Sequence, residues 1–465
     1  MRHYIYIILA TFLVLHGSAR AQRPGGPGDT SIYRIYGEQM ASLLAVRGVP
    51  REEIDELLKI YKGNNITSNE NFAGLLGKLY PANRGIGILF YFFSNDTLLR
   101  VFFSPGSVLE KESIPIKRED LLQLSTDFNH VLGLYASSDN RMPRKRGVII
   151  KPPPPTRGIN YDILVEKATR LLLPRAFNAS YKHLLIIPAL NIGTLPFHLL
   201  ATASPGRMLI DQCSFTIVPG IIDLIGLRVK TLKAVTRWHG DISQQFDENE
   251  SFRALDSTRF TLNNPLFVSN PAYPKQSDFV FPDLPGAKKE ISNAIPFAKN
   301  YRLFEGQAAV KDSILKYLGE SDVAYFATHG IADADEPMKK SFLVLSGNDP
   351  YLTAKNIMDI RKDYRQFPEM VILSACQTGL GKSMEAGVAG LARSFLLAGS
   401  NHVIMSLWNV DDEATAYLMN RFLYYLDKKT LFCPAEPLRL AQIDTRKKYP
   451  NPSRWASFSL FGIDY

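Results

Sequence analysis

From residue 160 onward, apolar runs of strand length alternate with segments of helical spacing, and this alternation constrains the fold more than any other feature. The runs "HLLIIPA", "PLFVSNPA", "DVAYFATHG", "EMVILSAC" and "HVIMSLWNV" are nearly continuous in apolar residues, as expected for strands buried on both faces. Helical patterns such as "GAKKEISNAIPFA" and "AVKDSILKYLG" lie between them. The sequence therefore predicts an α/β fold with a mostly parallel sheet covered by helices on both faces.

The chain before residue 160 has a different pattern. Residues 22–85 place apolar side chains at helical spacing, which predicts a helical leader too short for a tandem repeat array. The stretch "GIGILFYFFSNDTLLRVFFSP", which begins at residue 85, predicts two strands around a turn at 94–96, and a helix follows in "EDLLQLSTDFNHVLGLY". A basic, proline-rich linker is expected at 141–157.

The first 21 residues carry the pattern of a signal peptide. Arg2 precedes an apolar run of about a dozen residues, and Ala19 and Ala21 then form an A-x-A cleavage pattern. Such a run is too short to span a bilayer comfortably, which favours cleavage before Gln22 over a retained anchor. Because no later stretch approaches transmembrane length, we expect an exported protein without stable membrane insertion, in a periplasm or outside the cell of a bacterial source.

Charge and cysteine content narrow the expected partners. The net charge of +9 is a weak, sequence-wide bias, and an exported protein rarely meets nucleic acid, so no nucleic-acid partner is expected. The three cysteines, Cys213, Cys376 and Cys433, cannot form a disulfide framework and leave at least one thiol unpaired. Whether Cys213 and Cys433 pair stays open. No zinc-ligand spacing occurs and no dense calcium-ligand pattern is present, so neither a metal nor another cofactor is expected.

Two strand ends carry residues capable of chemistry. His329 closes the run "DVAYFATH", and Cys376 closes "EMVILSAC" 47 positions later. Carboxyl ends of parallel strands meet at one sheet edge, where ligands and chemistry gather. A thiolate is the nucleophile of cysteine proteases, and a neighbouring imidazole can take the thiol proton and later protonate the departing amine. The order and approximate gap match those of caspase-type cysteine proteases.

The segments around these residues resemble a known family. "HLLIIPALNIGTLPFHLL", "FVSNPAYP", "LPGAKKEI", "VAYFATHGIADADEP", "VILSACQTGLGKSMEAGVAGLARSFLLAGSNHVIMSLWNVDDEAT" and "WASFSLFGID" are similar to the CHAT family, caspase-like proteins of the clan of caspases, separase and gingipains. The dense match covers about 183–465, within a domain expected at 86–465. The resemblance implies a caspase-like three-layer α/β/α sandwich. It also implies His329 as general base and acid, Cys376 as nucleophile, and the backbone N–H groups of Gly330 and Cys376 as oxyanion donors.

The substrate pocket is less directly indicated. Asp411 and Asp412 follow the strand after the nucleophile's helix, where members of this clan often form the pocket for the residue before the scissile bond. Acidic walls there would select Lys or Arg, and the basic cluster at 141–146 would become a candidate self-processing site. In the alternative, which we prefer, Asp411 caps the following helix.

Three functions are compatible with these residues. The first is an exported cysteine endopeptidase that cleaves a protein or peptide substrate. The second is a catalytically silent caspase-like scaffold, with residues 22–85 binding a regulatory protein partner; retention of both His329 and Cys376 favours the enzyme. A phosphate-binding loop in "ACQTGLGKS" would need glycine where Cys376 stands, which disfavours a nucleotidase.

Overall fold

The computed structural model describes most of the chain. The described residues are 32–38, 41, 51–52, 54–55, 58–59, 66–132, 160–236, 262–275, 279–333, 337–360, 367–376, 384–408, 410–428 and 434–463. The predicted signal peptide at 1–21, the linker at 141–157 with its basic cluster, the stretch 377–383 and Cys433 lie outside them. Among the helices within these ranges, none combines the length and apolarity needed to cross a membrane.

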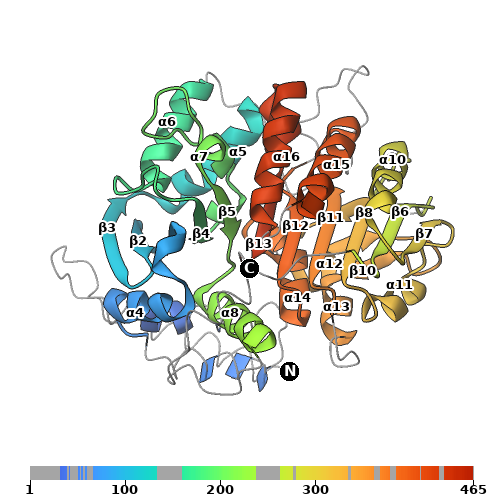
Figure 1. Cartoon of the computed structure of the whole chain (residues 1–465), viewed down its shortest axis with the longest axis horizontal. Helices are drawn as coiled ribbons and strands as arrows, with labels where there is room; N and C mark the ends of the chain where they lie inside the picture. Colours follow the sequence, from blue (N-terminus) through green and yellow to red (C-terminus); the bar gives the residue numbers. More distant parts are fainter. Residues whose placement is uncertain are drawn as a thin grey trace, which may run out of the picture.

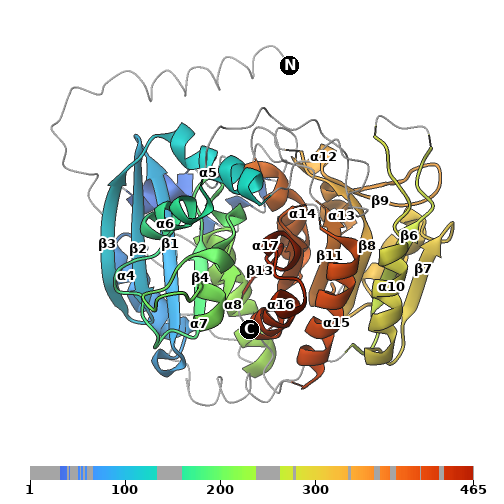
Figure 2. The same cartoon turned by 90° about the horizontal axis from the view of Figure 1, so that it is seen from above.

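A single large sheet runs through the molecule. Its path is β10-β9-β8-β11-β12-β13-β5-β4-β1-β2-β3, with β6 pairing β8 and β7 continuing beyond β6. Figure 2 shows the strands side by side from β3 to β7. The strands are β1 Ile86–Ser94, β2 Thr97–Ser104, β3 Ser107–Pro115, β4 His183–Ile187, β5 Ser214–Ile217, β6 Leu266–Pro271, β7 Arg302–Gly306, β8 Val323–Ile331, β9 Phe342–Val344, β10 Tyr351–Thr353, β11 Met370–Cys376, β12 His402–Ser406 and β13 Phe458–Gly462. The central pairings from β6 through β8 and β11 to β12 are parallel, as predicted.

Helices cover both faces of this sheet. The helices are α4 Asn69–Leu79, α5 Arg118–Val131, α6 Tyr161–Leu172, α7 Leu209–Gln212, α8 Ile221–Thr236, α10 Pro285–Ala294, α11 Lys311–Leu318, α12 Pro337–Lys340, α13 Ala354–Ile360, α14 Met384–Ala398, α15 Asp412–Lys428, α16 Ala435–Lys448 and α17 Pro452–Trp455. In Figure 1, α10, α15 and α16 lie on one side of the sheet and α8, α11, α13 and α14 on the other. The predicted layers of helix, sheet and helix are therefore confirmed.

Strand β8 illustrates why near-continuous apolar runs are needed. Successive side chains of a strand point to opposite faces. Tyr325 accordingly packs in the core beneath α10 and α15, whereas Phe326 packs in the core beneath α11 and α14. Both side chains are 0% exposed. A strand with helices on both sides has no solvent-facing row, so its sequence shows no polar alternation.

The hairpin β1–β2 forms at the predicted turn. Asn95 and Asp96 both have φ of 49°, and Ser94 pairs directly with Thr97 across the turn. Two residues with positive φ are the requirement of the type I′ turn that suits the twist of a hairpin, and Asn and Asp tolerate that region best. The hairpin extends through β3 and joins β4 through β1, so residues 86–115 belong to the same sheet as the C-terminal part.

The leader packs against this sheet. Tyr33 stacks on Phe90 of β1 with ring centroids 5.8 Å apart, and its hydroxyl donates to Asn69 Oδ1 at 2.7 Å. Tyr36 meets the same Phe90 edge-on at 5.2 Å, and its hydroxyl accepts the Ile221 N–H at the start of α8. The described aromatic side chains of the leader are thus part of the domain's own core.

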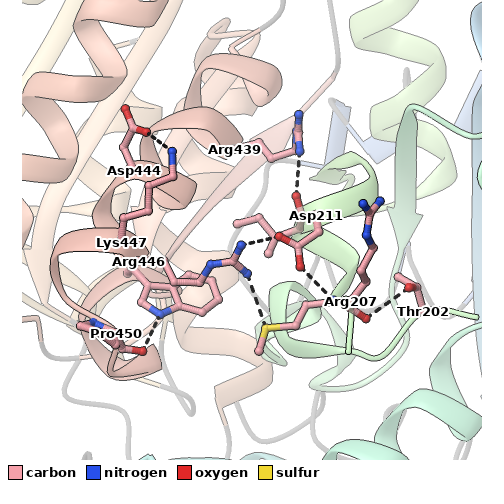
Figure 3. Close-up of polar contacts among 11 residues, drawn as sticks. Thr202, Arg207, Asp211, Arg439, Asp444, Arg446, Lys447 and Pro450 are labelled. Atoms are coloured by element: carbon pink, nitrogen blue, oxygen red, sulfur yellow. Dashed lines mark hydrogen bonds and ion pairs between the residues drawn. The ribbon is translucent and has the colours of Figure 1, made fainter. Parts of the chain in front are cut away.

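Helix α16, from the C-terminal part of the chain, contacts residues 198–211, which lie between β4 and β5. Figure 3 shows Arg446 of α16 paired with Asp211 of α7, and Arg439 of the same helix donates to the Ile210 carbonyl at 2.8 Å. Gln442, also in α16, is buried, and its Nε2 contacts His198 Nε2 at 3.0 Å. The amide N–H can only donate, so His198 accepts with a neutral imidazole. Burial lowers the pKa of His198 to about 3.

This buried imidazole predicts a loss of stability in acid. Below about pH 6.5 the unfolded chain binds a proton at His198 and the folded chain does not. The contribution of His198 to the free energy of unfolding is therefore complete above pH 6.5 and declines as pH falls toward 3. In urea unfolding, the stability advantage of the wild type over His198→Gln should shrink by about 1.4 kcal/mol per pH unit in that window. His402, whose pKa burial also lowers to about 3, should give the same slope. A gap that stays constant from pH 7 to 5 would contradict this expectation.

The end of β13 requires glycine. Gly462 has φ of 119°, and a Cβ on it would lie 2.1 Å from the carbonyl oxygen of Asn401, the residue directly before β12. Gly462→Ala should therefore lower stability by about 3 kcal/mol, since both backbone strain and the clash oppose it. The matched control is Gly74→Ala in α4, where nothing lies within 4 Å of the added Cβ. That change should stabilise slightly through helix propensity, and thermal unfolding of both variants measures the contrast.

Candidate active site

The register between β8 and β11 brings the two predicted catalytic positions together. These neighbouring strands are parallel, and Cys376 pairs directly with His329 at the end of their ladder. Neighbouring strands in a sheet lie about 4.8 Å apart, so the two backbones are as close as the sheet allows. Cys376 is the last residue of β11, and His329 lies two residues before the end of β8. The two positions therefore meet at the carboxyl edge of the sheet.

His329 is held by a backbone carbonyl. Its side chain is buried, and Nε2 lies 2.7 Å from the carbonyl oxygen of Pro282. A carbonyl can only accept, so Nε2 carries a proton; in the neutral imidazole Nδ1 then carries the lone pair. This contact fixes the tautomer that offers Nδ1 as the proton acceptor.

Aromatic rings border the same imidazole. The ring of Tyr273 lies 4.6 Å from that of His329, and the ring of Phe281 lies 5.5 Å away, centroid to centroid. Tyr273 follows β6, and Phe281 is the neighbour of Pro282 in the segment before α10. These rings limit the orientations of His329, because the imidazole cannot turn without displacing one of them.

Gly330 lies within strand β8 and not beyond its end. It pairs with Leu343 of the short antiparallel strand β9, and Ile331 continues the ladder. The strand thus runs past the histidine by two residues, which the apolar pattern does not reveal. The assignment of the Gly330 and Cys376 N–H groups as oxyanion donors stays a prediction.

The carboxylate of Asp411 is committed to two structural contacts. Its Oδ1 accepts the Ala414 N–H at 2.9 Å, which caps α15, and its Oδ2 pairs with Arg454 at 3.1 Å. The side chain is also 7% exposed. These are the contacts of the capping role preferred from the sequence.

Asp412 lies beside the start of α10, the helix that follows the segment in contact with His329. An ideal Cβ on Gly286 would fall 2.5 Å from the Asp412 Cβ, so the start of α15 touches the start of α10, four residues after Pro282. This close approach requires glycine at 286. The chain around Asp412 therefore reaches the same edge of the sheet as His329.

Cys213 differs from the cysteine at the strand end. It is a free, buried cysteine at the end of α7, and burial raises the pKa of its thiol to about 12. A thiol with such a pKa is protonated at neutral pH and is a poor nucleophile. Among the described residues it is thus an internal reference for an unreactive thiol.

Comparison with known proteins identifies the family. The CHAT domain model matches residues 161–463, which is well over half of the chain. The chain belongs to the CHAT family. This match confirms the predicted family, and the α/β sandwich expected for it is the one observed.

Other likenesses are more remote. Tetratricopeptide repeat protein 28 from Homo sapiens is 22% identical over 383 residues, which cover 72% of this chain but only 14% of that protein, and the Mus musculus protein is similar to the same degree. The structure of gingipain R, an Arg-specific cysteine proteinase, aligns with a TM-score of 0.40 at 10% identity over 65% of this chain and 67% of that one. A Saccharomyces cerevisiae separase–securin complex aligns with a TM-score of 0.48 at 14% identity, over 93% of this chain and 34% of that one. The chain spans about one seventh of the length of the curated relatives that it matches.

Sequence reasoning did not find the carbonyl of Pro282. A backbone carbonyl has no residue signature, because every residue carries one. The only signal was positional, since Pro282 lies between "FVSNPAYP" and "LPGAKKEI", two segments that resemble the family. The structure supplies this partner of His329 by folding the 279–284 segment onto the end of β8.

Proposed function

We propose that the chain is a cysteine endopeptidase in which Cys376 is the nucleophile and His329 the general base and acid. The register pairing of these two positions at the carboxyl edge of the sheet carries the proposal. The Nε2 contact with the Pro282 carbonyl supports it, because it leaves Nδ1 as the proton acceptor. A silent scaffold has no need for an imidazole of fixed tautomer beside a cysteine.

In the proposed reaction the Cys376 thiol gives its proton to Nδ1 of His329, and the sulfur attacks the carbonyl carbon of the scissile peptide bond. The C–N bond then breaks, and the imidazolium returns the proton to the departing amine. The acyl group stays on sulfur as a thioester, which a water molecule hydrolyses with the imidazole again taking a proton. The N–H groups of Gly330 and Cys376 are the proposed donors to the oxyanion.

For substrate preference we propose Lys or Arg before the scissile bond, with Asp412 as the acidic residue. Asp411 caps α15 and pairs with Arg454, and Asp412 lies where α15 touches α10. A carboxylate near the site selects a cationic side chain by charge pairing. Export through the predicted signal peptide, and a periplasmic or extracellular location, are part of the same proposal.

A peptide library tests the proposal. The full chain and its Cys376→Ala variant are incubated with peptides derived from a whole proteome, and new amino termini are mapped by mass spectrometry. The wild type should produce cleavages with Lys or Arg enriched before the cut, and Cys376→Ala should produce none of them. Equal cleavage by both proteins would overturn the enzyme. Absence of cleavage by either, with no faster alkylation of Cys376 than of an unfolded cysteine, would favour the scaffold.

A further inference from the structure

Asn270 has an unusual backbone and two directed side-chain contacts. It lies near the end of β6, is 3% exposed, and has φ of 40° at a point where the register with β7 shifts. Its Nδ2 donates to Asp283 Oδ1 at 2.8 Å, and its Oδ1 accepts the Leu284 N–H at 2.9 Å. The carboxylate can only accept and the N–H can only donate, so this orientation of the amide is the one that satisfies both.

These two contacts hold the residues that directly follow Pro282. Asp283 and Leu284 are both tied to one amide, and the Pro282 carbonyl immediately before them faces His329 Nε2 at 2.7 Å. Strand β6 is itself paired with β8, with Ser269 opposite Ala327. A continuous chain of contacts therefore runs from the rigid sheet through Asn270 to the carbonyl that orients the imidazole.

We propose that Asn270 is a positioning residue for His329: it fixes the 282–284 segment so that the Pro282 carbonyl selects the Nε2–H tautomer. This inference rests on the proposed peptidase function. Asn270 touches neither substrate nor the reacting atoms, so it acts only through Pro282. Loss of the amide frees the carbonyl, and the imidazole then samples the tautomer in which Nδ1 carries the proton and cannot accept one from the thiol.

The position makes three demands that asparagine meets together. The backbone needs a residue that tolerates positive φ, Asp283 needs a donor, and the Leu284 N–H needs an acceptor. Glycine meets only the first demand. Aspartate meets the first and third but sets its carboxylate against that of Asp283.

The kinetic test uses the full chain and the library-derived peptide. Asn270→Gly keeps the backbone conformation and should lower kcat by about 10- to 100-fold with little change in KM, because the reacting groups are misplaced while substrate contacts remain. Asn270→Asp should lower kcat at least as much. The exchange Asn270→Asp with Asp283→Asn restores a donor facing an acceptor and an acceptor for Leu284, so it should recover most of the lost kcat. Failure of the exchange to recover kcat beyond the single variant would contradict the proposal.

A spectroscopic measurement separates positioning from a merely structural role. In the Cys376→Ala background, the ¹⁵N chemical shifts of the imidazole report which nitrogen of His329 carries the proton. The Nε2–H tautomer should dominate with Asn270 present, and a mixture should appear with Asn270→Gly. An unchanged tautomer together with wild-type kcat in both single variants would overturn the role of Asn270. Cleavage that survives Cys376→Ala would instead overturn the peptidase itself.

Discussion

Replacing His329 with alanine should lower kcat/KM for peptide cleavage by about 10²- to 10⁴-fold, the usual contribution of a general acid–base group. Two steps suffer together, because the thiol loses its proton acceptor and the departing amine loses its proton donor. The variant should also slow alkylation of Cys376 by iodoacetamide at pH 7, since the neighbouring imidazole no longer favours the thiolate. Peptide mapping by mass spectrometry reads the alkylation of each cysteine separately.

Two controls accompany the His329→Ala experiment: the Cys213 thiol and a second histidine variant. Cys213 is buried with its pKa raised to about 12, so its slow alkylation should be the same in wild type and variant, and a change there would report loosening of the fold. His130→Ala removes a half-buried imidazole from α5 that has no part in the proposed mechanism, and it should leave cleavage unchanged. If His329→Ala cleaved peptides at the wild-type rate, the imidazole would have no role in catalysis.

The positions of His329 and Cys376 could be predicted from the sequence, because the pattern of apolar residues indicates where the buried parallel strands end. Apolar runs without polar alternation indicate strands covered on both faces, and parallel strands expose their carboxyl ends at one edge. His329 and Cys376 each stand at the end of such a run. The direct pairing of one with the other is then a matter of register, and the structure shows that they are opposite.

Strands without such a pattern were not predicted. Strand β3 carries alternating exposed and half-buried residues with Glu110, Lys111 and Glu112 in its centre, and it lies at the edge of the sheet. Charged side chains on an edge strand discourage pairing with other chains, and they also remove the apolar signal. Strands β5, β9 and β10 have only three or four residues, too few for a period to be recognised.

The surroundings of His329 depend on contacts that no local pattern encodes. Pro282 lies 47 residues before the histidine and contributes a carbonyl, not a side chain. Asn270 and Asp283 meet only because the segment after β6 folds back over the strand end. By contrast, the cap formed by Asp411 was predictable, because it joins residues three positions apart at a helix start. Local contacts follow from sequence rules, whereas the orientation of the imidazole is a tertiary property.

A second tertiary contact supports α14, the helix that follows Cys376 along the chain. Arg393 of α14 pairs with Asp223 in the first turn of α8 at 2.7 Å, with side chains 5% and 4% exposed. The N–H of Ile221 at the start of α8 donates to the Tyr36 hydroxyl, so the leader meets the same helix end. The Arg393–Asp223 pair thus links α14 to α8, two helices that lie far apart in the sequence.

Asp223→Ala should lower stability by about 3–5 kcal/mol, because it leaves the Arg393 guanidinium buried without its carboxylate. The midpoint of urea unfolding measures this loss. Glu320→Ala is the matched control: it breaks the Arg302–Glu320 pair, whose side chains are 50% and 54% exposed, and should cost less than about 1 kcal/mol. The double change of Asp223→Leu with Arg393→Met removes both charges and should recover much of the loss, since an apolar pair needs no compensation. Equal losses for Asp223→Ala and Glu320→Ala would mean that burial does not set the strength of the contact, and that α14 is held by its apolar face alone.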